Sequence, residues 1–263
     1  MIRMQSRELP AETLAELADL QQEIDNHPTY LERVRAALEL WPSRRRRKVF
    51  DRVEKELGDM CPGLKRCMFC EDNGAYQIEH FRPKALYPKL VYAWANYLFA
   101  CGQCNGPKSD RFAIFSANGK VLELVRTDSD PESEPSVLLD PRRDEPMDYL
   151  WLDLRGTFRF KPIHPEGTPE YDRADLTLDW LGLNERDELV EARRNAYDDY
   201  LVRFEKYVAK KRANCDAETL KRLRRSIERS THITVWREMQ RQRQTVDELR
   251  ALFEEAPEAL EWP

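Results

Sequence analysis

Four of the six cysteines form two Cys-x-x-Cys pairs, and this spacing is the first sign of chemistry in the chain. Cys67 pairs with Cys70, and Cys101 pairs with Cys104 after an interval of thirty residues. Each pair can place two thiolates on one side of a metal ion, and two pairs supply the ligands of a tetrahedral zinc site. Four protein ligands leave no position open to a substrate. The pattern therefore predicts a structural zinc ion that stabilises a segment poor in apolar residues.

Two cysteines lie outside these pairs. Cys215 is interpreted as a small apolar residue of a helix. Cys61 precedes Cys67 by six residues, so it could serve as a spare zinc ligand, and the sequence leaves that alternative open. In a reducing compartment the Cys-x-x-Cys spacing favours metal binding over disulfide formation.

A second group of polar residues lies within the cysteine frame and just after it. Glu79 and His80 are adjacent, Asn96 follows His80 by sixteen residues, Asn105 comes nine residues later, and Lys108 completes the group. Taken singly, each residue would be assigned a structural role, because a histidine beside a glutamate or an asparagine in a turn is common. Together, and framed by the cysteine pairs, they predict a catalytic site.

The residue types in this group suit the hydrolysis of a phosphodiester bond. A neutral imidazole can take a proton from water near neutral pH. A carboxylate and an amide oxygen suit a hard divalent cation such as Mg²⁺ or Mn²⁺. Such a cation binds a phosphate oxygen and stabilises the leaving 3′ oxygen. DNA is the expected substrate, and the same chemistry allows RNA.

At these residues the chain resembles the HNH endonuclease family in its zinc-bearing form. The resemblance implies a ββα-metal fold, in which two strands and a helix surround one divalent ion. It implies that His80 is the general base, that Glu79 and Asn105 bind Mg²⁺ or Mn²⁺, that Asn96 orients His80, and that Lys108 steadies the phosphate. The chain departs from the family pattern in two ways: Asn105 replaces the last histidine of the motif, and Glu79 stands where aspartate is frequent.

The resemblance narrows to PtuB-type HNH proteins, the nuclease subunits of Septu and of some retron-linked anti-phage systems. It implies a PtuA-like ATPase partner. Residues 1–60 and 196–263 carry no recognisable signature. The likeness is carried by IEHFRPKALYP at 78–88, by the residues around the second cysteine pair, and by LLDP at 138–141, LGLN at 181–184 and EARR at 191–194.

The formal net charge of the chain is -5. Proteins that bind a nucleic-acid duplex unaided are usually basic, so phosphate contacts must come from local patches or from a partner. Residues 43–66 carry nine Lys/Arg against four Asp/Glu, and residues 203–229 carry ten against four. Both stretches could equally be the solvated faces of helices. Arg82, Lys84 and Lys89 are further candidates for contact with the substrate backbone, with the same alternative.

The chain shows no apolar run of the ~20 residues that a membrane span needs, and its first residues lack a signal-peptide pattern. We therefore expect a cytoplasmic protein without a membrane partner. Two functions from different classes remain: a DNA-cleaving enzyme, or a non-catalytic zinc-stapled subunit that binds nucleic acid or acts as a scaffold.

Hydrophobic periodicity predicts a mostly helical α+β fold, with the small ββα-metal core held by the Cys₄ zinc site between helical flanks. We divide the chain into an N-terminal helical region (1–60), the nuclease core with its zinc knuckles (61–125) and a C-terminal hairpin and helical region (126–263). Expected elements are helices at 11–26, 29–41, from Pro42 to about 60, 170–181, 185–214, 216–231 and on through 253, a strand at 118–125, an acidic loop at 127–136 and a hairpin at 150–163.

Overall fold

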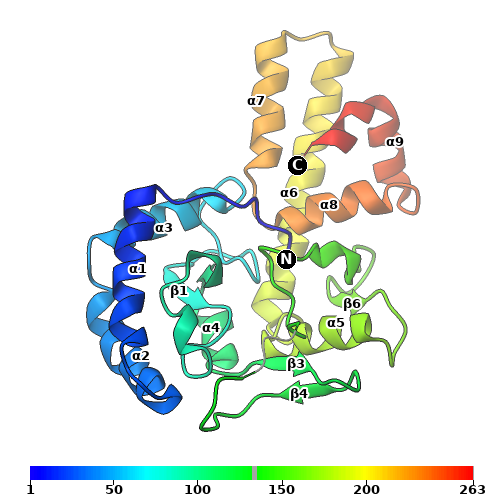
Figure 1. The fold of residues 1–263 in the computed structure, drawn as a ribbon. Helices are drawn as coiled ribbons and strands as arrows, with labels where there is room; N and C mark the ends of the chain where they lie inside the picture. Colours follow the sequence, from blue (N-terminus) through cyan, green and yellow to red (C-terminus); the bar gives the residue numbers. More distant parts are fainter. Residues whose placement is uncertain (132–134, 263) are drawn as a thin grey trace.

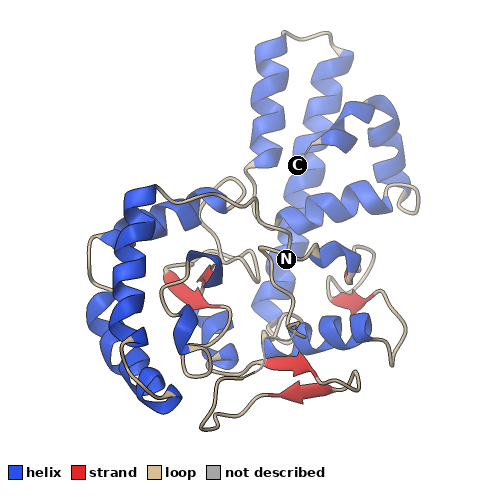
Figure 2. Cartoon of the chain, in the orientation of Figure 1, coloured by secondary structure: helices blue, strands red, loops and turns tan. Residues whose placement is uncertain are grey.

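The computed structural model describes residues 1–131 and 135–262, and about half of these lie in helices (Figures 1 and 2). Strands are few and short, and the described part of the chain contains three two-stranded antiparallel sheets. The predicted mixed, helix-rich fold is confirmed at this level. The predicted acidic loop includes residues 132–134, which lie outside the described residues. Within the described part, no helix combines the length and apolar character needed to cross a bilayer.

Three helices form the N-terminal region: α1 (Ala11–Asp25), α2 (Tyr30–Arg44) and α3 (Val49–Met60). A capping box between Thr29 and Glu32 starts α2, since each side chain accepts a hydrogen bond from the other residue's backbone N–H. The prediction that Pro42 begins the third helix is wrong. Pro42 lies in the last turn of α2, where a proline removes one hydrogen bond after the buried residues have already fixed the helix.

Two antiparallel strands and a short helix follow, in the order that the sequence analysis expected. β1 (Gln77–His80) pairs with β2 (Tyr97–Ala100), with Glu79 opposite Leu98 and His80 opposite Tyr97. β2 is fully buried and leads directly into α4 (Gly102–Lys108). Between the strands, the chain passes through two 3₁₀ turns, η1 (Pro88–Leu90) and η2 (Trp94–Asn96). Figure 1 shows α1 to α3 wrapped along one side of β1 and α4.

The rest of the chain is built on α6, a helix of 26 residues. In Figure 1 one end of α6 lies beside α5, and the other end stands between α7 and α9. The predicted strand at 118–125 and the hairpin at 150–163 are confirmed as β4 and as β5 with β6, whereas β3 is too short to leave a pattern in the sequence. These elements are β3 (Ala113–Phe115), β4 (Val121–Glu123), η3 (Pro146–Asp148), β5 (Leu150–Leu152), β6 (Phe160–Pro162), α5 (Pro169–Trp180), α6 (Asp187–Arg212), α7 (Ala217–Glu228), α8 (Ile233–Gln242), α9 (Asp247–Glu255) and η4 (Pro257–Glu261).

One cluster of buried apolar side chains includes members from all three predicted domains. The boundaries of those domains stay a prediction. In the C-terminal part, the Phe204 ring of α6 lies edge-on to Trp236 at 5.2 Å and contacts Phe253 at 4.7 Å and Trp262 at 6.1 Å between centroids. Phe204 is fully buried, so it joins α6 to α8, α9 and the end of the described chain.

We predict that Phe204→Ala lowers the free energy of unfolding by about 3–5 kcal/mol, because it removes an aromatic ring from a closed cluster and leaves a cavity. Urea unfolding followed by circular dichroism measures the change. Val202→Ala, in the same helix but with the side chain 62% exposed, is the control and should stay within about 0.5 kcal/mol of the wild type. Equal effects of the two substitutions would contradict this account of the cluster.

Candidate metal centre and active site

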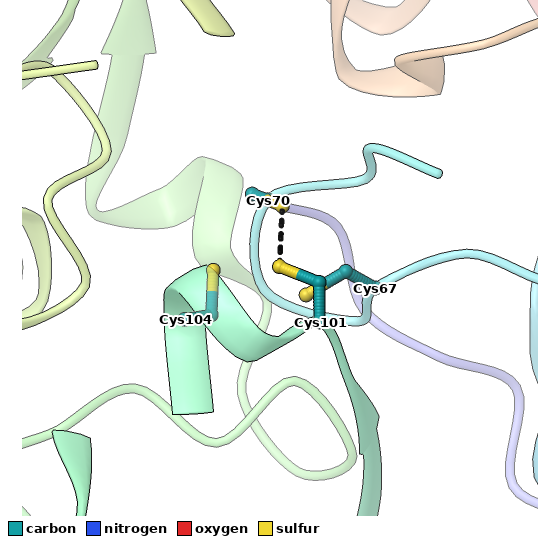
Figure 3. A group of neighbouring side chains, drawn as sticks. All are labelled: Cys67, Cys70, Cys101 and Cys104. Carbon is teal, nitrogen blue, oxygen red and sulfur yellow. Dashed lines mark hydrogen bonds between the residues drawn. The ribbon is translucent and has the colours of Figure 1, made fainter. Parts of the chain in front are cut away.

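The four paired cysteines converge on one point. Cys67 and Cys70 lie in a tight turn before β1, Cys101 precedes α4, and Cys104 lies in the first turn of α4. All four side chains are buried, their sulfur atoms lie within 4.8 Å of one another, and Figure 3 shows them turned toward one another. The Cys70 and Cys101 Sγ atoms are 3.7 Å apart. A tetrahedral zinc ion with bonds of ~2.3 Å would hold two sulfurs about 3.8 Å apart, so the residues fit this ion.

The charge of this centre is balanced from a distant part of the chain. Arg186 Nη2 lies 3.4 Å from Cys104 Sγ, and Arg186 Nη1 donates to Gln103 Oε1 at 3.2 Å. Burial opposes the charge on Arg186, but the neighbouring cysteine side chains, Cys104 first, raise its pKa above the ordinary value. Hydrogen bonds from the other thiols hold the pKa of Cys101 well below its usual range. A guanidinium is therefore in place to offset the negative charge of thiolate ligands.

Sequence reasoning missed Arg186, because 82 residues separate it from Cys104. Its only sign in the sequence was its place two residues after the LGLN segment at 181–184, which carries part of the resemblance to PtuB-type proteins. The segments 181–184 and 191–194 have a physical role in the structure. Arg186 also donates to the Leu181 and Gly182 carbonyls. The buried Arg193 donates to the Leu183 carbonyl at 2.7 Å. The two segments fix the turn that presents Arg186 to the sulfurs.

Cys61 and Cys215 are not members of the four-sulfur cluster that the described residues form. The Cys61 thiol donates instead toward the backbone carbonyls of Leu57 and Arg66, at 3.5 and 3.3 Å. Burial raises the pKa of this thiol. Cys61 is therefore a neutral, buried thiol beside the metal centre rather than a fifth ligand. The interpretation of Cys215 as a residue of a helix is wrong. It lies between the end of α6 at Arg212 and the start of α7 at Ala217, and it is half-buried.

Glu79, Asn105 and Lys108 gather where α4 covers β1. Lys108 Nζ lies 2.6 Å from Glu79 Oε1 and 3.0 Å from the His80 carbonyl oxygen, and both charged side chains are buried. Asn105 Nδ2 donates to Gln77 Oε1 at 2.7 Å. Burial raises the pKa of Glu79 above its ordinary value, although the Lys108 charge opposes that shift. Gln77, two residues before Glu79 and so on the same face of the strand, is a member that the sequence analysis did not single out.

The His80 side chain lies on the other side of β1, because successive residues of a strand point to opposite faces. Its Nε2 lies 2.9 Å from the Val91 carbonyl oxygen, which can only accept, so Nε2 carries the proton and Nδ1 has the free lone pair. The ring packs edge-on against Trp41 at 4.4 Å and Tyr97 at 5.4 Å. Burial, together with the Lys84 charge, lowers the pKa of His80 to about 3, and only 4% of the residue is exposed.

Asn96 closes the long connection between β1 and β2. Its Oδ1 accepts from the Arg82 backbone N–H at 2.8 Å, and its Nδ2 donates to the Arg82 and Leu90 carbonyls, both at 3.0 Å. The Tyr97 hydroxyl donates to the same Val91 carbonyl that holds His80, at 2.7 Å. Among the hydrogen bonds of the described residues, none joins Asn96 to the imidazole. Asn96 instead fixes the loop whose Val91 carbonyl holds the ring.

The structure thus brings the expected residues together in two groups rather than one. Glu79, Asn105 and Lys108 form a polar group under α4, and His80 lies with the loop that Asn96 holds. Among the described residues, no hydrogen bond joins the His80 side chain to Glu79 or Asn105. The two groups are linked through the backbone, and the charge of Lys84 acts on both. It opposes the rise that burial causes in the pKa of Glu79, and it adds to the fall that burial causes in the pKa of His80.

The basic stretch that leads into α3 is partly neutralised by the protein itself. Arg44 and Arg47 pair with Glu23, and Arg45 pairs with Glu54. Lys89, another candidate for backbone contact, pairs with Asp130 at 2.6 Å. A phosphate role for this stretch therefore stays a prediction, and any phosphate would compete with these carboxylates.

Comparison with known proteins gives one informative similarity. The Septu protein PtuB of Bacillus thuringiensis is 27% identical to the chain over 133 residues, which are 49% of this chain and 40% of that protein. The chain thus matches less than half the length of this relative. No family model matches the chain, and no solved structure matches it.

The sulfur geometry predicts close to one zinc ion per purified chain, measured by inductively coupled plasma mass spectrometry. Cys104→Ser should lose most of this zinc and unfold at a lower temperature, because the metal can then bind only three thiolates. Cys61→Ser is the matched control, since Cys61 lies outside the cluster, and it should keep its zinc. Loss of zinc from the control, or full zinc in Cys104→Ser, would contradict the four-sulfur assignment.

Proposed function

We propose that this protein is a metal-dependent HNH endonuclease that hydrolyses the phosphodiester bonds of DNA. The observation that carries the proposal is the contact of α4 with β1, in the ββα order. Lys108 of α4 contacts Glu79, and Asn105 of α4 contacts Gln77, directly beside His80 in the chain. The similarity to a Septu protein supports a role as the nuclease effector of an anti-phage defence system. In that role the protein would work with an ATPase partner.

The donor set fits a hard divalent cation. Glu79 offers a carboxylate, and the Asn105 amide, whose nitrogen donates to Gln77, offers its oxygen. The buried Lys108 ammonium lies against the same carboxylate, so it already supplies a positive charge where the cation would bind. Mg²⁺ or Mn²⁺ held there by Glu79 and Asn105 would supply charge stabilisation for the phosphate. Lys108 would then move from the carboxylate toward a phosphate oxygen.

His80 is the general base of this proposal. The Val91 carbonyl sets its tautomer, so Nδ1 is the atom that takes the proton from water. At neutral pH the imidazole carries no charge, which is the state a base needs. A phosphate arriving near Lys84 would offset that lysine's charge and raise the pKa of His80, because a nearby anion favours the imidazolium. Substrate would thus strengthen the base that acts on it.

Access to His80 is closed in this structure. The ring is almost fully covered, and the Trp41 side chain at the end of α2 packs on it at 4.4 Å. The last turn of α2 contains Pro42 and is the nearest place where the cover could shift. Catalysis requires a displacement of Trp41 that admits water to Nδ1.

A non-catalytic zinc-stapled subunit is the second candidate. The observation that favours it is the Glu79–Lys108 ion pair, which satisfies the carboxylate without a cation. A buried imidazole under Trp41 also suits a purely structural residue. The two candidates differ in whether His80 matters for cleavage.

We predict that His80→Ala lowers the cleavage rate of plasmid DNA in Mg²⁺ or Mn²⁺ by about 10²–10⁴-fold, the usual contribution of a general base. Zinc content and secondary structure should stay as in the wild type. His27→Ala, at an exposed position between α1 and α2, is the control and should cleave normally. Equal cleavage by wild type and His80→Ala would refute the catalytic role, and no cleavage by either, alone or with the ATPase subunit, would favour the scaffold.

The partner is tested separately. Co-expression with the ATPase subunit of a Septu-type system should yield a complex of higher mass than either chain alone by multi-angle light scattering. The expected cause is an interface on the exposed faces of the C-terminal helices. A chain that stays a monomer and elutes apart from the ATPase would count against this part of the proposal.

A further inference from the structure

The second basic stretch of the sequence lies in a helical hairpin, formed by α7 and the C-terminal half of α6. α6 and α7 run antiparallel, and Figure 1 shows α7 and the neighbouring end of α6 projecting beyond the part that holds β1, β2 and α4. Leu223 and Ile227 of α7 are buried against α6, and Asp216 caps α7 through the Thr219 backbone N–H at 2.9 Å. The hairpin is therefore an ordered arm rather than a loose tail.

One flank of this arm is marked by a contact between its two helices. Arg203 of α6 donates to the Ser226 carbonyl of α7 at 3.0 Å. Residues three or four positions apart in a helix share a flank. Lys206 and Lys210 therefore lie on the flank of α6 that Arg203 marks, and Arg222 and Arg229 lie on the flank of α7 that Ser226 marks.

The four basic residues of this seam are Lys206, Lys210, Arg222 and Arg229. All four are exposed, and none has an ion-pair partner among residues 1–131 and 135–262. Four other basic residues of the arm are paired: Arg203 with Asp199, Lys211 with Glu258, Arg212 with Glu255 and Arg224 with Glu228. Lys221 and Arg225 of α7 are exposed and, like the seam, have no ion-pair partner in the described part of the chain. Three acidic residues lie close to the seam in sequence: Glu205 precedes Lys206, Glu228 precedes Arg229, and Glu218 lies one turn before Arg222. Of these, Glu228 already pairs with Arg224. The seam is thus a concentrated positive surface on a chain whose net charge is -5.

We propose that this seam binds the phosphate backbone of double-stranded DNA outside the cleavage site, an inference that rests on the proposed function. Charge complementarity favours a polyanion as the ligand, because long cationic side chains repeat on successive turns of the seam. The surface beside them is poor in apolar side chains, since Val202 is the one large exposed apolar residue of α6. Protein interfaces are instead centred on apolar and aromatic side chains. Contacts with phosphates supply affinity for DNA that does not depend on sequence. A nuclease with a negative net charge otherwise lacks this affinity.

The test measures binding without cleavage. Full-length protein is titrated in buffer without Mg²⁺ or Mn²⁺ against a fluorescein-labelled DNA duplex several turns long, over a series of salt concentrations, with fluorescence anisotropy as the readout. The double substitution Lys206→Glu and Arg222→Glu should raise the dissociation constant roughly tenfold and reduce the slope of log affinity against log salt by about two. The neutral pair Lys206→Gln and Arg222→Gln should give a smaller change of the same sign.

The matched control is Lys120→Glu with Arg155→Glu, which makes the same charge change at exposed positions on other elements. It should bind the duplex as the wild type does. An arm variant with wild-type affinity and salt slope overturns the proposal, as does a control that loses as much affinity as the arm variant. Because the assay measures binding in buffer without the Mg²⁺ or Mn²⁺ that cleavage needs, a failed cleavage experiment and a failed arm experiment are distinguishable.

Discussion

The convergence of four sulfur atoms is the constraint on which the candidate site depends. Two of the cysteines precede β1 and two lie at the start of α4, so one ion would fix both ends of the β1–β2–α4 unit. The unit has only short strands and a helix of seven residues, too little to be stable alone. Structural zinc contributes about 10–16 kcal/mol in small zinc-binding peptides, which is ample for this task. The position of Glu79 relative to Asn105 follows from that closure.

Residues of the four-cysteine cluster and beside it also join the core to the C-terminal part of the chain. Arg186 reaches Cys104 from the turn before α6, and the buried Glu71, one residue after Cys70, accepts from the Thr234 backbone N–H of α8 at 2.9 Å. These contacts explain why residues far downstream of the cysteines matter to the site. They also suggest a physical reason for the 181–184 and 191–194 matches, since both segments position the arginine that balances the thiolates.

The sequence predicted what depends on local spacing and missed what depends on distant packing. Cysteine spacing and helical periodicity are local, so the four-sulfur cluster and most helices could be anticipated. Two contacts of the site join residues that lie tens of positions apart: Trp41 with His80, and Arg186 with Cys104. No local sequence pattern predicts either contact. Strand alternation was available in the sequence, and it already implied that Glu79 and His80 point to opposite faces.

The two polar groups of the site are each closed by a contact that the proposed substrate chemistry would replace. Lys108 neutralises the buried Glu79 carboxylate, and taking such a pair from water is costly unless each charge is fully matched. A divalent cation would match the carboxylate more strongly and free the ammonium for phosphate. Trp41 covers an imidazole that burial keeps uncharged. Under the proposed function, cleavage would therefore require two separate changes, cation binding at Glu79 and displacement of Trp41 from His80.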